Sequence, residues 1–221
     1  MFNVTRIYPA PACIARGHYT KEEVLVVLKP MFFEKCYLCE RDEIQDVEVE
    51  HFIPHEGDDA LKYSWENLFY SCSRCNSIKS NRHVNLLDCT DGTLDVGSLI
   101  SCKMPSAPSD RVMVGTTSQN PTQEMINTAR LLDECFNLEN TALRGISREA
   151  LMEQLWDHYT DLLNARRVLR NKKSPEVDKI RAEQTISAML TVKHPFSMFW
   201  RYYYLGDTFL VNTYAHLRVG F

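Results

Sequence analysis

Apolar and polar residues alternate from Val47 to Phe52, which is the pattern of a half-buried β-strand. Elsewhere the apolar positions recur at helical spacing, in short runs before residue 90 and in longer ones after Pro121. Helices are predicted at residues 24–28, 73–82, 122–135, 147–170 and 174–190. The pattern therefore predicts an α-rich α+β protein in which one short strand stands among helices.

Local signals refine the ends of these helices. Thr20 and Glu23 have the spacing of a capping box ahead of the first helix, and Pro30 is expected to end it. Ser174 is expected to cap the last of the long helices, with Pro175 in its first turn. The segment 196–205 holds six aromatic residues among ten, too many to remain in water, so it is expected to dock on the helical core or on another protein chain.

Composition divides the chain into three parts. Residues 1–90 contain the predicted strand and most of the chemically informative residues, and residues 91–120 are rich in Gly, Ser, Thr and Pro, as in an irregular connector with a small hairpin. Residues 121–221 are expected to form a helical region that docks on a partner. No leader or membrane-spanning run is visible, so a cytoplasmic location without membrane contact is expected.

Two Cys-x-x-Cys pairs flank the predicted strand: Cys36 with Cys39, and Cys72 with Cys75. Four thiolates in two closely spaced pairs are the ligand set of a tetrahedral structural Zn²⁺, although buried free thiols are the simpler alternative. The other cysteines lack ligand spacing and are expected to be free thiols; they are Cys13, Cys89, Cys102 and Cys135. The sequence thus predicts a zinc clamp around residues 36–75.

Polar residues inside this clamp suit a hard metal ion and a general base. Glu50 offers carboxylate oxygens, and Asn67 and Asn76 offer amide oxygens. His51 has an imidazole that titrates near neutral pH. These residue types favour metal-assisted chemistry at this place in the chain.

Residues 33–85 resemble the HNH (ββα-metal) nucleases. In that family an acidic residue and a His end one strand, an Asn lies in the following loop, and a His or Asn lies on the helix after the second zinc pair. Here these positions are Glu50 with His51, then Asn67 in Glu-Asn-Leu, then Asn76 in Cys-Asn-Ser-Ile-Lys. The resemblance implies a zinc-stabilised ββα-metal module embedded in a mainly helical frame.

The resemblance also implies roles in phosphodiester cleavage. His51 would be the general base, and Glu50 and Asn76 would bind a catalytic Mg²⁺ (or Mn²⁺). Asn67 would fix the loop and the tautomer of His51, and Lys79 would meet a phosphate oxygen. Many members of the family carry Asp at the position of Glu50.

His55 leaves two interpretations open. It lies four residues after His51 and could join the metal site. A surface histidine in an acidic loop is the simpler interpretation.

Short matches in the C-terminal half resemble the HNH proteins that accompany an ATP-binding partner in anti-phage systems of the Septu and retron-associated kind. They are Phe136-Asn-Leu138 followed by Leu143-Arg144, and His194-Pro-Phe-Ser197 with Arg201-Tyr-Tyr203. The resemblance implies an effector subunit that docks on an ATPase partner, with a possible homo-dimer inside the complex. Nucleic acid is the implied substrate, with DNA favoured over RNA.

Charge qualifies this interpretation. The chain has a formal net charge of −4, and residues 40–66 hold ten acidic side chains against two basic ones. A basic run between residues 166 and 173 is the main compensation, either as a surface that follows phosphates or as an ordinary solvated helix face. Weak nucleic-acid binding by the chain alone is expected. A catalytically inactive zinc module that binds nucleic acid or protein is the alternative function.

Overall fold

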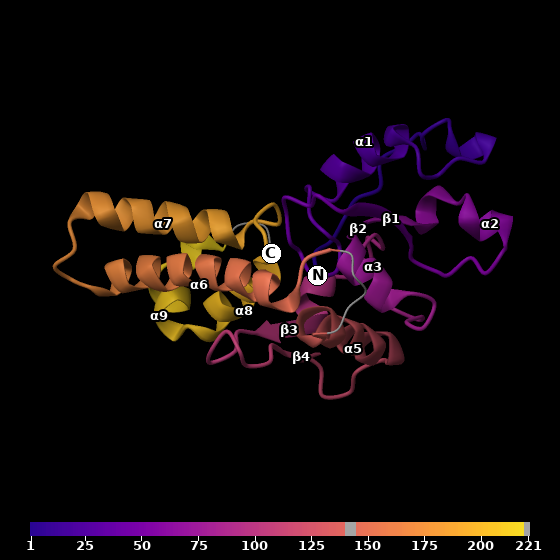
Figure 1. The fold of residues 1–221 in the computed structure, drawn as a ribbon. Helices are drawn as coiled ribbons and strands as arrows, with labels where there is room; N and C mark the ends of the chain where they lie inside the picture. The colour runs from indigo at the N-terminus through magenta and orange to yellow at the C-terminus, as the bar shows by residue number, and fades with distance from the viewer. Residues whose placement is uncertain (140–144, 219–221) are drawn as a thin grey trace.

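The computed structural model describes residues 1–139 and 145–218 (Figure 1). The N-terminal part contains a two-stranded sheet with helices around it. Its elements are η1 (Ile14–Arg16), α1 (Glu22–Met31), β1 (Val47–His51), α2 (Asp59–Lys62), η2 (Trp65–Asn67), β2 (Leu68–Cys72) and α3 (Ser73–Lys79).

The rest of the described chain is mainly helical, with one small hairpin. Its elements are α4 (Val96–Leu99), β3 (Ile100–Lys103), β4 (Met113–Thr116), α5 (Gln123–Asn137), α6 (Arg148–Arg170), α7 (Glu176–Leu190), α8 (Ser197–Gly206), α9 (Thr208–Thr213) and η3 (Ala215–Leu217). The hairpin of β3 and β4 lies in the segment where the sequence predicted one. The α-rich α+β class is confirmed.

A ββα unit is built from β1, β2 and α3. The strands pair antiparallel with Val47 opposite Cys72 and His51 opposite Leu68, and every residue of β2 is buried. The next residue after β2 begins α3, so strand and helix are joined without a loop. This unit therefore holds the end of β1 beside α3, where most of the candidate site residues lie.

Several predicted helix ends are corrected. The capping box is wrong, because α1 begins at Glu22 after Lys21 and no side chain caps it. Pro30 lies inside the last turn of α1, although it has no N–H to donate to the preceding turn, and the helix ends one residue later at Met31. Helix α3 ends at Lys79 because the next residue, Ser80, has a positive φ of 43°.

The long helices α6 and α7 agree with the sequence pattern. Ser147 accepts a hydrogen bond from the backbone N–H of Ala150 and so caps α6. Helix α7 begins at Glu176 with Pro175 at the cap position, one residue later than expected. The two helices lie side by side as an antiparallel pair that extends away from the ββα unit (Figure 1).

The aromatic segment forms α8 and packs on this chain's own core. Phe199 meets Phe136 of α5 edge to face at 5.2 Å between ring centroids, and Trp200 stacks on Tyr159 of α6 at 6.4 Å. Trp200 is fully buried and is therefore not available to a partner, whereas Tyr202 and Leu205 remain exposed. The sequence left two docking surfaces open for this segment, the helical core and another protein chain. For Trp200 the structure shows the helical core.

A buried ionic network joins the N-terminal part to α8. The carboxylate of Glu40 lies 3.3 Å from the Lys35 ammonium and accepts hydrogen bonds from the Ser197 hydroxyl at 2.7 Å and the Met198 backbone N–H at 3.2 Å. Burial alone would raise the pKa of Glu40, but Lys35, the amino group of Met1 and Ser197 lower it to about 2. Glu40 is therefore ionised, and its carboxylate links the segment after Cys39 to the start of α8.

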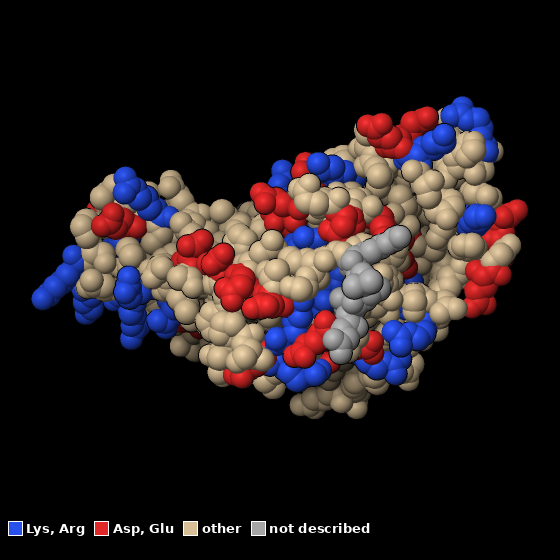
Figure 2. Space-filling model, viewed as in Figure 1, with Lys and Arg blue, Asp and Glu red and all other residues tan. Residues whose placement is uncertain are grey.

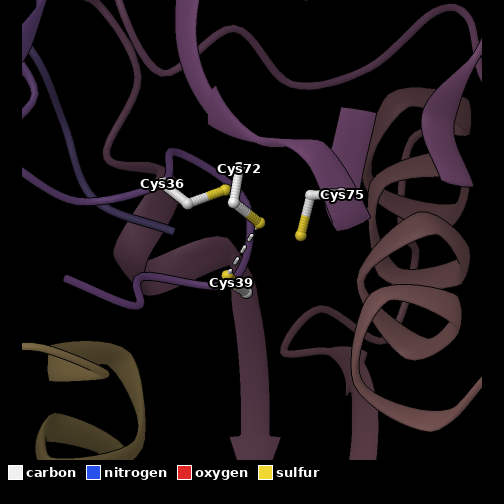
Figure 3. A group of neighbouring side chains, drawn as sticks. All are labelled: Cys36, Cys39, Cys72 and Cys75. Carbon is white, nitrogen blue, oxygen red and sulfur yellow. Dashed lines mark hydrogen bonds between the residues drawn. The ribbon is translucent and has the colours of Figure 1, made fainter. Parts of the chain in front are cut away.

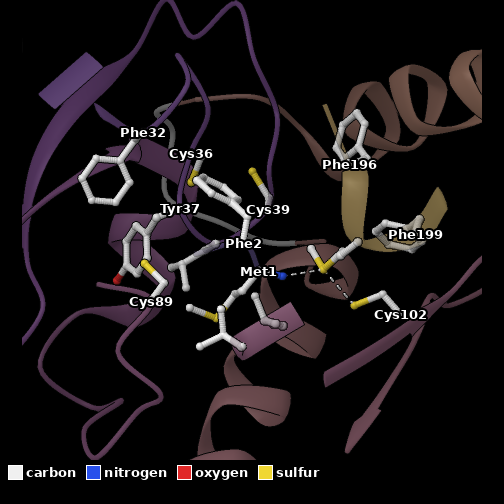
Figure 4. Packing of buried hydrophobic residues seen from close by; sticks show 14 of the residues in the cluster. Met1, Phe2, Phe32, Cys36, Tyr37, Cys39, Cys89, Cys102, Phe196 and Phe199 are labelled. Atoms are coloured by element: carbon white, nitrogen blue, oxygen red, sulfur yellow. Dashed lines mark hydrogen bonds between the residues drawn. The ribbon is translucent and has the colours of Figure 1, made fainter. Parts of the chain in front are cut away.

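Apolar packing surrounds this network. Figure 4 shows side chains from the N-terminal segment, from residues 32–39, from β3 and from α8 in one cluster, including Phe2, Tyr37, Cys102 and Phe199. The buried cluster runs on through α5, α6 and α7. The division into parts at residues 90 and 120 stays a prediction.

Leu143 and Arg144 lie outside the described residues. None of the helices in the described chain is both long enough and apolar enough to cross a membrane.

Replacing Glu40 with Gln should destabilise the fold, because it leaves the fully buried ammonium of Lys35 without its counter-charge. The expected loss is about 3 to 5 kcal/mol in the free energy of unfolding, measured by denaturant titration at pH 7. Glu34→Gln is the matched control, since Glu34 pairs with Lys29 at the surface and its loss should cost about 0.5 kcal/mol or less. Equal effects of the two substitutions would contradict the role assigned to Glu40.

Candidate functional site: a cysteine cluster and an adjoining polar cavity

The four cysteines of the two predicted pairs form one buried cluster. One ligand atom from each lies within 4.8 Å of every other, and the Sγ atoms of Cys39 and Cys72 are 3.9 Å apart. Figure 3 shows all four side chains pointing toward a common centre, two from the loop before β1 and two from the junction of β2 and α3. In a tetrahedral zinc site the sulfur atoms are about 3.8 Å apart, so the arrangement fits structural Zn²⁺.

Among the four thiols the electrostatic surroundings favour the thiolate at Cys36, whereas hydrogen bonds with the other cysteines raise the pKa values of Cys39 and Cys75 well above their usual value. Burial would raise the pKa of the Cys36 thiol, but hydrogen bonds from the other three cysteines lower it well below its usual value. Arg41 lies near the thiolates of Cys39 and Cys72, which together with Asp46 raise the pKa of its guanidinium against the effect of burial. A cation thus compensates part of the negative charge that four thiolates would bring.

A second arginine links the cluster to α5. Arg74 lies between the two ligands Cys72 and Cys75, is fully buried, and donates from Nε to the carbonyl of Cys135 at 3.0 Å and from its terminal nitrogen to the carbonyl of Leu138. Cys135 itself is close enough to hydrogen bond with the Cys75 thiol. Cys135 is therefore a free thiol, as expected, but it is in contact with the cluster.

An open cavity of about 390 Å³ lies beside the end of β1, and it brings together three of the predicted site residues. Glu50 and His51 from β1 and Asn76 from α3 line it. His55 and Tyr19 are also part of its wall. Asn67 and Lys79, the other two predicted residues, lie behind this wall.

His51 has a defined orientation. Its Nε2 lies 3.0 Å from the backbone carbonyl of Lys62, which can only accept, so Nε2 carries the proton in the neutral ring and Nδ1 is left as an acceptor. Burial is the main cause that lowers the pKa of His51, and the charges of His55 and Lys79 act in the same direction. A neutral imidazole with a free Nδ1 is suited to accept a proton.

Asn67 fastens the loop that supplies the carbonyl of Lys62. Its Oδ1 accepts from the Ile53 backbone N–H at 2.7 Å, and its Nδ2 donates to the carbonyls of Ile53 at 2.8 Å and Leu61 at 3.0 Å. Leu61 and Lys62 are neighbours at the end of α2. The side chain of Asn67 thus fixes the peptide unit next to the one whose carbonyl orients His51.

Glu50 and Lys79 form a buried ion pair beneath the cavity. Glu50 Oε1 is 2.6 Å from the Lys79 ammonium, which also donates to the backbone carbonyl of His51 at 2.9 Å. Burial raises the pKa of Glu50 to about 7 against the attraction of Lys79. Lys79 is fully enclosed, which is not the surface position that a contact with a phosphate oxygen would need.

Asn76 has an acidic partner that sequence reasoning missed. Its amide nitrogen donates to the carboxylate of Glu48, two residues before Glu50 on β1. Residues i and i+2 of a strand share one face, so the spacing of Glu48 and Glu50 was a usable signal. With the amide turned over, Asn76 and Glu48 present two oxygens side by side, which are ligands that Mg²⁺ prefers.

Two aromatic rings enclose the imidazole of His51. Tyr19 and His55 each meet it edge to face, both at 4.7 Å between ring centroids. His55 accepts a hydrogen bond at Nδ1 from the Gly57 backbone N–H at 3.2 Å. His55 therefore lies at the cavity, and Tyr19 is a neighbour of His51 that no local sequence signal announced.

Comparison with known proteins agrees with this geometry. The family model described as HNH endonuclease matches residues 36–82. These residues form an HNH domain. The matched range includes all four clustered cysteines and all five predicted catalytic or metal-binding residues, so the HNH domain is the ββα unit with its cysteine cluster.

A curated relative extends the similarity beyond the motif. Over 81 residues the chain is 33% identical to the Septu protein PtuB of Bacillus thuringiensis, a stretch that covers 35% of this chain and 32% of that protein. The chain thus matches about a third of the length of this relative. No solved structure matches the chain.

Purified protein should contain about one Zn²⁺ per chain, and Cys75→Ser should lower both the zinc content and the thermal stability, because structural zinc contributes directly to folding. Elemental analysis and thermal unfolding measure the two effects. The matched control is Cys89→Ser, which removes another buried thiol outside the cluster and should leave the zinc content unchanged. Full zinc content in Cys75→Ser would contradict the assignment of the cluster.

Replacing Asn67 with Ala should release the tautomer of His51, because the Leu61 carbonyl loses its hydrogen bond and the neighbouring Lys62 carbonyl is held less firmly. Nitrogen-15 chemical shifts of the imidazole should show a protonated Nε2 in the parent protein and a mixture of tautomers in the variant. Loss of the buried hydrogen bonds should also cost about 1 to 3 kcal/mol of stability. Asn81→Ala, at an exposed asparagine, is the control; an unchanged tautomer in Asn67→Ala would refute the role.

Proposed function

We propose that this protein is a metal-dependent endonuclease that hydrolyses phosphodiester bonds at the cavity of its HNH domain. The observation that carries the proposal is the orientation of His51: its Nε2 is held by the Lys62 carbonyl, so Nδ1 is the acceptor in a cavity shared with Glu50 and Asn76. A general base beside oxygen ligands is the arrangement that hydrolysis of a phosphodiester requires.

His51 would take the proton from an attacking water molecule. The water oxygen forms a bond to phosphorus while the bond to the departing sugar oxygen breaks, and the proton first held at Nδ1 returns to solvent. The low pKa of His51 keeps the ring neutral and ready to accept near pH 7. Tyr19 and His55 limit rotation of the ring by their edge-to-face contacts.

Glu50 and Asn76 would hold the catalytic cation, and Glu48 is a further candidate ligand beside Asn76. A bound Mg²⁺ or Mn²⁺ would supply positive charge to offset the charge that develops on the departing oxygen. The carboxylate and amide oxygens present are the donor types that these ions prefer. Asn67 supports the site from behind, through the loop that carries Lys62.

Lys79 is given a different role from the one the resemblance implied. Its buried ammonium is in contact with Glu50, so it would help to keep this carboxylate ionised in a site where burial favours the protonated form. In this role Lys79 acts on the metal ligand rather than on the substrate.

The substrate is proposed to be nucleic acid, with DNA favoured over RNA, and the setting an anti-phage complex with an ATPase partner. Similarity to a relative named Septu protein PtuB supports this setting. Charge also supports a need for a partner: Figure 2 shows acidic side chains near α2 and Lys and Arg gathered at the far end of the α6–α7 pair. A net charge of −4 gives the chain little general attraction for a phosphate backbone.

His51→Ala should lower the rate of cleavage by about 10²- to 10⁴-fold, the usual contribution of a general base. The assay follows nicking of plasmid DNA and cleavage of RNA with Mg²⁺ or Mn²⁺, with the chain alone and with proteins that co-purify with it. His216→Ala is the matched control, because His216 is exposed and lies in η3, outside the HNH domain.

Two results would count against the endonuclease. Absence of cleavage by the wild-type protein under all these conditions would favour the inactive zinc-stabilised binding module. Equal cleavage by wild type and His51→Ala would show that any activity comes from elsewhere.

A further inference from the structure

A second cavity adjoins the one at His51, and Tyr19 belongs to both. The second cavity, of about 310 Å³, lies along β1 and is lined by Val47, Glu48, Val49, Asn76 and residues near the start of α1. Tyr19, Val49 and Asn76 line both cavities. The two spaces thus adjoin as one groove along β1, and Tyr19, whose ring contacts that of His51, lies where they meet.

The walls of this groove lack the side chains that hold a duplex backbone. Among the described residues that line it, none is Lys or Arg, whereas Glu48, Glu50 and Glu56 are all present. Proteins that bind double-stranded DNA obtain most of their affinity from several cationic contacts to phosphates. Such contacts are missing from the surface closest to the candidate catalytic residues.

The cationic side chains close to the groove are in contact with other protein groups. Lys79 is enclosed and paired with Glu50, and the ammonium of Lys62 lies over the ring of Tyr63 at 5.2 Å. Arg82 donates to the hydroxyl of Ser80 at 3.3 Å and to the carbonyl of Ile78 at 3.3 Å. None of the three lines the groove.

In place of cationic side chains, the groove has the aromatic ring of Tyr19. Tyr19 is half-buried, and its ring lies 4.7 Å from that of His51 and 6.2 Å from that of Tyr63. The turn that returns the chain to the site uses Gly17 at a φ of +79°, where a side chain would be strained. The fold therefore places an aromatic ring directly beside the proposed general base.

We infer that this groove binds single-stranded nucleic acid, with one base stacked on Tyr19 and the adjacent phosphate at His51, Glu50 and Asn76. Single-strand sites usually combine cationic contacts with aromatic stacking, and this groove has the stacking ring without the cations. An unpaired base can use that ring, whereas the bases of a duplex are stacked on one another and unavailable. The inference rests on the proposed endonuclease function and specifies its substrate: unpaired DNA or RNA, including loops and flipped-out bases.

The test measures binding without cleavage, in the His51→Ala protein, using oligonucleotides that carry the fluorescent base 2-aminopurine. Single-stranded DNA, single-stranded RNA and duplex DNA of one sequence are compared with Mg²⁺ present. Single strands should bind more tightly than the duplex, and 2-aminopurine fluorescence should be quenched on binding because the base stacks on Tyr19. The DNA and RNA strands separate the two sources of an unpaired base.

Adding Tyr19→Ala should weaken single-strand binding by about 5- to 100-fold and abolish the quenching, while Tyr19→Phe should keep both within about twofold. Tyr202→Ala is the matched control, because Tyr202 is an exposed tyrosine of α8. Quenching is the decisive signal, since a purely structural role for Tyr19 would change the cleavage rate without changing the environment of the base.

Failure of this inference is distinct from failure of the proposed function. Duplex binding as tight as single-strand binding, or quenching that survives Tyr19→Ala, would overturn the stacking site while leaving His51-dependent cleavage intact. Tyr19-dependent quenching without cleavage by the wild-type protein would support the stacking site and overturn the endonuclease.

Discussion

The arrangement of the HNH domain depends on the cluster of four thiols that closes around the ββα unit. Cys36 and Cys39 lie in the loop before β1, whereas Cys72 and Cys75 lie where β2 passes into α3. A metal ion shared by these four would fix the start of the helix relative to the strand pair. Every residue proposed to bind a cation or move a proton is placed by this junction.

Within the HNH domain, single hydrogen bonds determine where the side chains of the site lie. Asn67 holds the peptide of Leu61, the next carbonyl holds His51, and the backbone of His51 in turn accepts from Lys79. Each group is satisfied by the next, which is the condition under which a buried polar network gives one defined geometry. The open side of the cavity is lined by groups that can still accept hydrogen bonds, such as Nδ1 of His51.

The sequence predicted those parts of the site whose residues are close together in the chain. The cysteine pairs, the strand ending at His51 and the helix that begins at Ser73 follow from spacing and alternation. Glu48 could have been found by the same reasoning, because it shares a strand face with Glu50.

Other features depend on contacts between distant segments, which no local pattern encodes. Tyr19 reaches His51 from before α1, and Glu40 reaches α8 from more than 150 residues away. The enclosure of Lys79 has the same origin, because its spacing after Asn76 predicts a helix position but not which side of that helix is covered. The aromatic run at 196–205 was correctly expected to avoid water, but only the packing shows that Trp200 faces the core of this chain.

Arg74 links the thiol cluster to helix α5, outside the HNH domain. This residue stands between two of the metal ligands and closes the last turn of α5 by donating to its carbonyl groups. Oxidation of the thiols would therefore disturb the end of a helix that is buried against α3 and α6. The nuclease-like unit and the helical half are on this view a single cooperative structure, and in evolution they would be expected to travel together rather than to be exchanged as separate modules.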